Sequence, residues 1–204
     1  MIFIDVEASG LHPTSYPVEV AWVSHDLQQG WPALIRPASA WGELDWNAES
    51  GRIHGISRHQ LVMTGMDVRE VAARLNADLA GAEVLSDSPG TDGRWLQTLY
   101  GTTGIAPAFR ISQSPDVQAV IAEACQRTGI QAEDHERLAA ALHAEAGLIT
   151  HRALDDAIGH AFSLGAVTLL NMALSREEVE IRAFRQQLVE RARGLLRQYG
   201  RGAS

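Results

Sequence analysis

The chain has 204 residues, of which 46% are hydrophobic and 21% charged, a composition that excludes wholesale disorder and predicts one ordinary domain with a sizeable core. Its 25 acidic and 17 basic residues give a net charge of -8, which argues against a protein that holds long nucleic acid on a broad basic surface. The single cysteine, Cys125, excludes a disulfide framework and a cysteine-rich zinc site, and its apolar helical surroundings favour a buried, inert thiol.

Two features bear on location. The opening residues 1–10 lack the basic start of a signal peptide. The longest apolar stretch, 161–174, is interrupted by polar residues and is too short to cross a bilayer. We therefore expect a cytoplasmic protein with no membrane partner.

Strands dominate the first forty residues and helices the last ninety. Apolar and β-branched runs predict strands over 1–6, 17–24 and 27–36, the last two forming a hairpin, and a loop rich in Trp, Gly and Pro to about residue 55. Next come a helix over 68–79 capped by Asp67, a strand at 82–86, a helix over 92–100 and a strand at 108–112. Helices are then expected over 115–128, 132–146, 151–173 and 175–199, the last opening on a capping box of Ser175 and Glu178. This order predicts an α/β fold with a mixed sheet flanked by helices.

Two carboxylates, Asp5 and Glu7, stand two residues apart at the end of the first apolar strand, so their side chains are expected on one face of the sheet. Such a pair is costly next to a core unless a cation lies between the two groups, although acid pairs of this spacing also arise by chance. A second pair, Asp134 and Glu136, lies in a polar helical segment and is interpreted as solvated surface.

Two further segments place acids at the starts of helices. Asp92 follows a strand and a Gly/Pro turn, where α/β sheets place ligands, but it could equally cap its helix, and Asp87 could be an ordinary turn residue. His151 and Asp156 are five residues apart at the start of the long helix and would share a cleft if His151 lies on the loop before the first turn. The alternative is a surface or capping histidine.

Taken in order, these segments resemble the motifs of the DnaQ-like, or DEDDh, 3′–5′ exonuclease superfamily over roughly residues 1–173. The motif D-x-E-x-[ST]-G is matched by Asp5, Glu7, Ser9 and Gly10, and the motif of Asp followed by x-x-aromatic-Leu is matched by Asp92, Trp95 and Leu96. The motif H-x-A-x-x-D-A is matched by His151, Ala153, Asp156 and Ala157. An I-H-G-I segment is matched by residues 53–56. The chain departs from the pattern at Ala8, where the family usually has Thr, and at Asp87 and Ser88, where it often has His-Asn.

The resemblance implies a ribonuclease H-like fold with a mixed five-stranded sheet, three antiparallel strands first, flanked by helices. It implies an exonuclease domain over 1–173 and a C-terminal helix over 174–204. Asp5, Glu7, Asp92 and Asp156 would hold two Mg²⁺ or Mn²⁺ ions, which suit hard oxygen ligands, and His151 would act as general base. The implied activity is release of nucleoside 5′-monophosphates from the 3′ end of single-stranded DNA or RNA.

Substrate contacts are implied as well. The resemblance assigns the 3′ end to Ala8, Ser9, Gly10, Leu11 and His54, with Leu11 against the last base and His54 near the 3′-hydroxyl. Core packing is the alternative for Leu11, and a loop hydrogen bond is the alternative for His54. Tyr16, Trp41 and Trp46 would either stack on bases or cover the sheet.

The last helix carries an apolar stripe, and residues 176–201 hold seven arginines and four glutamates, a local charge of +3. Packing on the domain is the simplest interpretation, and a homodimer contact or a basic guide for the strand are the alternatives. Two other functions remain open at this point: a nucleic-acid-binding module that keeps the fold without hydrolysis, and an acidic scaffold protein.

Overall fold

Three antiparallel strands form the centre of the fold in the computed structural model, which describes residues 1–42, 45–113, 115–174 and 178–200. In the order β1-β2-β3 they are β1 (Ile2–Ala8), β2 (Pro17–Ser24) and β3 (Gly30–Leu34). All residues of β2 except the last are buried, as expected for a central strand whose two faces are both covered. The third strand is shorter than the predicted 27–36.

Two short parallel strands continue on the other side of β1. They are β4 (Glu83–Val84) and β5 (Arg110–Ile111). One parallel bridge joins Phe3 to Leu85: the Ile4 N–H donates to the Leu85 carbonyl, and the Leu85 N–H donates to the Ile2 carbonyl, both at 2.9 Å. The expected mixed sheet is thus built as three strands plus two strands linked by one bridge, rather than as one continuous five-stranded ladder.

Helices account for most of the remaining described chain. They are α1 (Ala48–His54), α2 (Arg58–Thr64), α3 (Val68–Leu79), α4 (Pro89–Thr103), α5 (Val117–Thr128), α6 (Ala132–Ala146), α7 (Ala153–Met172) and α8 (Glu178–Gln198). The predicted bounds of α3 and α6 are confirmed, and Asp67 caps α3 by accepting a hydrogen bond from the Arg69 N–H. The capping box expected from Ser175 falls outside the described residues.

The helix α1 lies in the segment that was predicted to be a loop. Its sequence holds a glycine and buries only His54, so it shows no apolar periodicity to reveal it. Its start is fixed instead by polar contacts: the Asn47 side chain accepts from the Ser50 N–H, and the Asn47 N–H donates to the Ser9 carbonyl at 2.8 Å. The helix is therefore tied to the loop that leaves β1.

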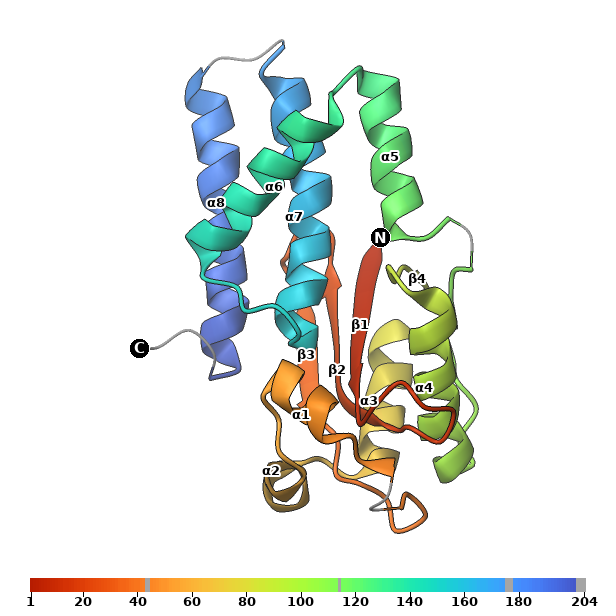
Figure 1. Ribbon diagram of the computed structural model, residues 1–204. Coiled ribbons are helices and arrows are strands. Elements are labelled where there is room, and N and C mark those ends of the chain that lie inside the picture. The colour runs from red at the N-terminus through yellow and green to blue at the C-terminus, as the bar shows by residue number, and fades with distance from the viewer. Residues whose placement is uncertain (43–44, 114, 175–177, 201–204) are drawn as a thin grey trace.

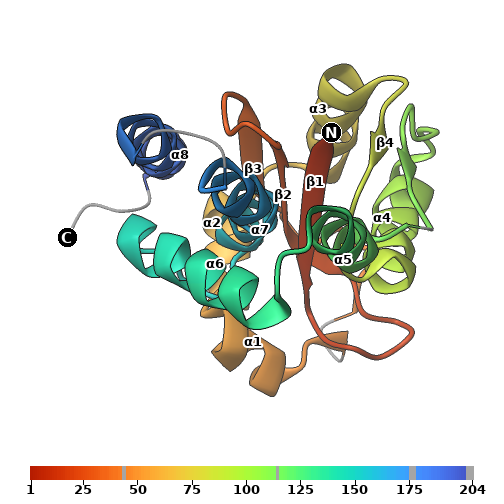
Figure 2. The same ribbon diagram turned by 90° about the horizontal axis from the view of Figure 1, so that it is seen from above.

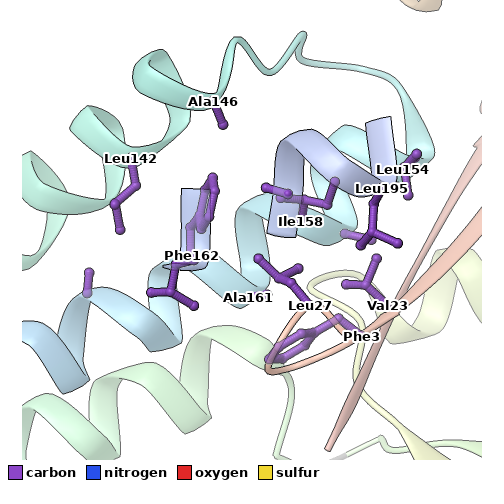
Figure 3. Packing of buried hydrophobic residues seen from close by; sticks show 14 of the residues in the cluster. Phe3, Val23, Leu27, Leu142, Ala146, Leu154, Ile158, Ala161, Phe162 and Leu195 are labelled. Carbon is purple, nitrogen blue, oxygen red and sulfur yellow. The ribbon is translucent and has the colours of Figure 1, made fainter. Parts of the chain in front are cut away.

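The sheet separates two apolar layers (Figures 1 and 2). Ile4 and Val6 of β1 join the core under α3 and α4, whereas Phe3 joins the core under α5, α7 and α8, because side chains alternate along a strand. Figure 3 shows the second core, where Phe3, Val23 and Leu27 meet residues of α6, α7 and α8. No helix within the described ranges is long and apolar enough to cross a membrane.

The last helix packs on this second core. Leu188, Ala192 and Leu195 of its predicted stripe are buried, and the Tyr199 hydroxyl donates to the Gly30 carbonyl at 2.9 Å. The Arg185 guanidinium also reaches Glu145 of α6 at 3.0 Å. The apolar stripe of α8 is therefore occupied by its own chain, which favours the packing interpretation, while the domain boundary at residue 173 and a homodimer stay predictions.

Substitution of Leu188 tests how strongly α8 contributes to the fold. Leu188 is 3% exposed, so Leu188→Ala should lower the free energy of unfolding by about 2–5 kcal/mol through lost burial and a cavity. Val179→Ala is the matched control, because Val179 on the same helix is 74% exposed and should change stability by less than about 0.5 kcal/mol. Urea unfolding followed by circular dichroism measures both, and equal effects would contradict the packing of α8.

Candidate active site

The site begins at the end of β1 on the face that α7 covers. Asp5 and Glu7 share this face with Phe3, as their two-residue spacing predicts. In the antiparallel register Glu7 is paired with Glu19 of β2, so two carboxylates stand side by side on one face of the sheet. Like charges in that position repel one another and require a cationic neighbour.

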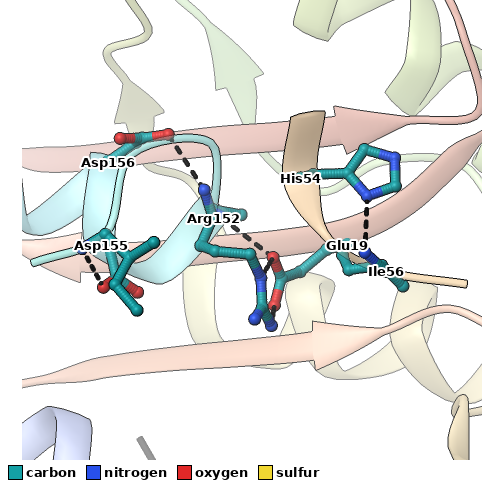
Figure 4. A network of polar contacts seen from close by, with 8 residues as sticks. Glu19, His54, Ile56, Arg152, Asp155 and Asp156 are labelled. Atoms are coloured by element: carbon teal, nitrogen blue, oxygen red, sulfur yellow. Dashed lines mark hydrogen bonds and ion pairs between the residues drawn. The ribbon is translucent and has the colours of Figure 1, made fainter. Parts of the chain in front are cut away.

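That neighbour is Arg152 (Figure 4). Its Nε and Nη2 atoms donate to the two carboxylate oxygens of Glu19 at 2.9 and 2.6 Å, and the Ala153 N–H donates to Glu19 at 3.0 Å. Glu19 is 3% exposed, so this is a buried, charge-assisted contact. It fixes the first residue of α7 to the central strand, beside β1.

The start of α7 buries its first acid, Asp155, and directs the next, Asp156, to the cavity. His151 lies on the loop before the helix with φ 61°, a left-handed conformation that is strained for a residue other than glycine. Asp156 accepts from the Arg152 N–H at 3.2 Å. Asp155 is 1% exposed and accepts from the Ile149 N–H at 2.8 Å. Asp155 therefore holds the loop, as Figure 4 shows, and Asp156 is the acid of this pair that lines the cavity described below.

The start of α4 supplies another carboxylate. Asp92 lies in the first turn of the helix and is 3% exposed, and the Ser86 hydroxyl donates a short hydrogen bond to it. Ser88 occupies the N-cap position, so the interpretation of Asp92 as the cap is wrong. The Ser88 N–H donates to the Ser86 oxygen at 2.9 Å, which orients the serine toward Asp92.

These segments enclose one cavity of about 620 Å³. Sequence reasoning singled out some of the side chains that line it, namely Asp5, Glu7, Leu11, Asp92, His151 and Asp156. It gave no role in the site to three further polar side chains that also line it, namely Asp87, His143 and His160. The three separate segments of sequence thus meet in space, and the cavity carries five carboxylates and three imidazoles.

The predicted substrate residues are divided by the structure. Leu11 is 76% exposed at the cavity, so core packing is excluded for it. Ala8 is buried in the core on the other side of the sheet, and Gly10 lines a neighbouring hollow with Leu11. The Ser9 N–H donates to the Tyr16 carbonyl and its own carbonyl accepts from Asn47, so both polar groups of the Ser9 backbone are already used within the chain.

His54 and the predicted stacking aromatics all pack against other side chains, and the role of His54 near the 3′-hydroxyl stays a prediction. His54 is 4% exposed, and its Nδ1 accepts from the Ile56 N–H at 3.1 Å, which is the loop hydrogen bond named as the alternative. Tyr16 and Trp41 are buried and stack on each other with ring centroids 4.9 Å apart. Trp46 is partly buried and packs edge-on against the His54 ring. Tyr16 and Trp41 therefore do not present their faces to bases.

Burial and mutual repulsion dominate the electrostatics of the cavity. Removal from solvent and then the charge of Asp156 raise the pKa of Glu7 to about 8. Burial raises the pKa of Asp92 to about 7 against the hydrogen bond from Ser86, and burial raises the pKa of Asp156 to about 6. The pKa of Asp5 is raised well above its usual value by burial and by Asp92. The site thus disfavours its own negative charges, and a cation would stabilise them.

The ligand atoms form two groups that could each hold a metal ion. In one, atoms of Glu7, His151 and Asp156 all lie within 4.8 Å of one another. In the other, atoms of Asp5, Asp87 and His160 meet the same limit. Among the described residues Asp92 belongs to neither group, and its expected role as a direct metal ligand stays a prediction.

Sequence reasoning missed Glu19, Arg152, Asp87 and His160 as parts of the site. His160 follows Asp156 by four residues, so helical spacing alone places both on one face of α7. Asp87 and Glu19 carry no such signal, because a turn acid and a lone acid in an apolar strand occur in many contexts.

Comparisons with known proteins address the fold. No protein-family model matches the sequence, and no curated protein matches it. The chain is similar to E. coli exonuclease I in complex with a dA16 oligonucleotide, at 14% identity and a TM-score of 0.61, covering 85% of this chain and 41% of that one. It is also similar to the zinc-ion-bound form of the E. coli exonuclease I complex with single-stranded DNA, at 14% identity and a TM-score of 0.59, covering 85% and 41%. A further exonuclease I structure gives 15% identity and a TM-score of 0.58, covering 83% and 40%.

These likenesses show a shared fold. The chain spans less than half the length of the exonuclease I chains that it matches. The superfamily suggested by the motifs and the activity are separate questions from the fold.

The raised pKa values predict how the metal-free protein responds to pH. Because the pKa of Glu7 rises from 4.5 to about 8 on folding, the native state binds the Glu7 proton more tightly than the unfolded state does. The stability that this proton contributes is present below pH 4.5 and is lost as pH rises to about 8. In chelator, the free energy of unfolding of the wild type should fall relative to that of Glu7→Gln between about pH 4.5 and pH 8. Urea titrations across this range test it, and parallel pH profiles would contradict the raised pKa.

Removal of the Glu19 charge should destabilise the fold. Glu19→Gln leaves Arg152 without its anion, and breaking such a buried pair costs about 3–5 kcal/mol. The control is Glu178→Gln, whose partner Arg182 is as exposed as Glu178 itself, and it should cost less than about 1 kcal/mol. Chemical unfolding of the two variants measures the difference. If Glu19→Gln were no more destabilising than the control, the pair would not be what holds α7 in place.

Proposed function

We propose that the chain is a metal-dependent 3′–5′ exonuclease of the DnaQ-like (DEDDh) superfamily, with a ribonuclease H-like fold and its catalytic domain over residues 1–173. It would hydrolyse phosphodiester bonds at the 3′ end of single-stranded DNA or RNA and release nucleoside 5′-monophosphates. The observation that carries the proposal is the convergence of β1, α4 and α7 on one cavity, which brings together Asp5, Glu7, Asp92, His151 and Asp156.

The residues present suit divalent cations. The carboxylates are hard oxygen ligands of the kind that Mg²⁺ and Mn²⁺ prefer. Burial raises the pKa values of Glu7 and Asp156 despite the nearby Arg152 and His151, so a bound cation would favour the charged forms of both acids. Glu7 and Asp156 lie close enough, together with His151, to hold one ion, and Asp5 anchors the second group. Two bound cations would neutralise the scissile phosphate and make a water molecule more acidic.

Each residue then has a distinct task. Asp5, Glu7, Asp92 and Asp156 would hold the cations, and the hydrogen bond from Ser86 orients the Asp92 carboxylate. His151 is exposed on the rim and accepts the proton of the attacking water. Arg152 takes no part in the proton transfer, because Glu19 occupies its guanidinium. It positions His151 and Asp156.

Support for the substrate is indirect. Leu11 projects from the loop after β1 into the cavity, where an apolar side chain can pack against the terminal base. Structures of E. coli exonuclease I, which share the fold, include complexes with single-stranded DNA. The net charge of -8 disfavours a long electrostatic contact with the strand and favours a short end held through cations.

Degradation of a 5′-labelled oligonucleotide tests the proposal. Matched single-stranded DNA and RNA should be shortened stepwise from the 3′ end with Mg²⁺ or Mn²⁺ and left intact in chelator. Asp156→Asn should abolish the shortening, and His151→Gln should slow it by about 10²–10⁴, the usual contribution of a general base.

The matched control is Asp134→Asn, a half-exposed carboxylate on α6 that should leave the rate unchanged. Binding of the oligonucleotide without shortening under both metals would replace the proposal by a binding module on the same fold. Shortening that survives Asp156→Asn would place the chemistry elsewhere.

A further inference from the structure

A second group of side chains lies in the cavity beside the one formed by Glu7, His151 and Asp156. Asp5 comes from β1, Asp87 from the turn before α4, and His160 from the third turn of α7. One oxygen or nitrogen atom of each lies within 4.8 Å of the others. Three elements far apart in sequence therefore direct two oxygens and one nitrogen toward a common point.

His160 is the informative member of this group. Its side chain is 12% exposed, and its Nε2 atom is shielded from solvent without a hydrogen-bond partner in the described part of the chain. The Asp87 carboxylate lies 3.9 Å from Nε2, which is too long for a hydrogen bond. A buried ring nitrogen left without a partner costs free energy, and a cation bound in the cavity would remove that cost.

Packing fixes the direction of this nitrogen. The His160 ring packs against Phe3 with centroids 6.2 Å apart at 58°. His143 of α6 lies close to α7, since a Cβ on Gly159 would come within 2.3 Å of its Nε2. The His160 imidazole therefore packs on the sheet through Phe3, with its Nε2 atom 3.9 Å from Asp87 and with Asp5 in the same group.

We propose that Asp5, Asp87 and His160 bind a first-row transition-metal ion, with Mn²⁺ as the probe, in preference to Mg²⁺. The proposal deepens the proposed exonuclease function, on which it rests for the role of the cavity, by naming the ligands and the class of cation of the second metal position. Imidazole nitrogen favours transition metals, whereas Mg²⁺ prefers oxygen ligands and retains its waters.

The geometry fits a cation of this size. Bonds of about 2.1–2.2 Å place ligands on opposite sides of an ion about 4.3 Å apart and adjacent ligands about 3 Å apart. The three ligand atoms lie within 4.8 Å of one another, so binding requires only a small inward movement of the half-exposed Asp87.

Binding of Mn²⁺ to the full chain without nucleic acid tests the proposal. Electron paramagnetic resonance of free Mn²⁺ should show two bound ions per wild-type chain. His160→Gln and Asp87→Asn should each weaken one of the two by tenfold or more, and His160→Gln should change the titration by Mg²⁺ little. His59→Gln and Asp134→Asn, both exposed, are the matched controls and should bind as the wild type does.

Coordination of Mn²⁺ by a ring nitrogen gives a spectroscopic signal that would be absent if His160 had only a structural role. In a His151→Gln background, which removes the imidazole of the other metal group, pulsed magnetic resonance of bound Mn²⁺ should show a nitrogen coupling that disappears on adding His160→Gln. Circular dichroism in chelator confirms that the variants are folded. Unchanged Mn²⁺ affinity and nitrogen coupling in His160→Gln would overturn the proposal.

The two proposals fail separately. If His160→Gln loses one Mn²⁺ but the wild type does not degrade oligonucleotides, the metal site is supported and the exonuclease function is rejected. Degradation with unaltered Mn²⁺ binding in His160→Gln would keep the exonuclease and reject this site.

Discussion

The buried contact between Glu19 and Arg152 is the interaction on which the cavity depends. Taking two charges out of water is costly, and here the cost is offset by two guanidinium hydrogen bonds and by the N–H of Ala153 at the positive end of α7. Glu19 stands on the central strand directly opposite Glu7. A helix anchored there must place its first turn over the end of β1, and the loop before it follows.

The same arrangement gathers negative charge in a partly buried cavity, where water screens the charges poorly. Five carboxylates line one cavity, and burial disfavours the charged form of each of those whose pKa is raised. Arg152 is bound to Glu19 and offsets only part of this charge, since it lowers the pKa of Glu7 by less than burial and the neighbouring acids raise it. The native structure is therefore poised to gain stability from cations, because any ion bound only by the folded state shifts the folding equilibrium toward it.

Single-residue offsets decide which side chains belong to the scaffold and which to the cavity. Ile4 and Val6 pack under α3 and α4, whereas Asp5 and Glu7 turn to the opposite face because strand side chains alternate. On α7 the hundred-degree step between neighbours sends Asp155 back to the Ile149 N–H, while its neighbour Asp156 lines the cavity. Residues that line the cavity and residues that pack in the scaffold thus alternate along the same short segments.

Local periodicity was enough to place the strands near their positions, to bound α3 and α6, and to put Asp5 and Glu7 on one face, since period and caps are properties of neighbouring residues. The motif resemblance singled out Asp92, His151 and Asp156, which do meet at one cavity. The polar helix α1, the division of the sheet, the pair of Asp87 with His160 and the Glu19–Arg152 contact came only from the tertiary structure. Spacing along a chain encodes which way a side chain points from its own element, but partners 73 or 133 residues apart are chosen by how whole faces pack together.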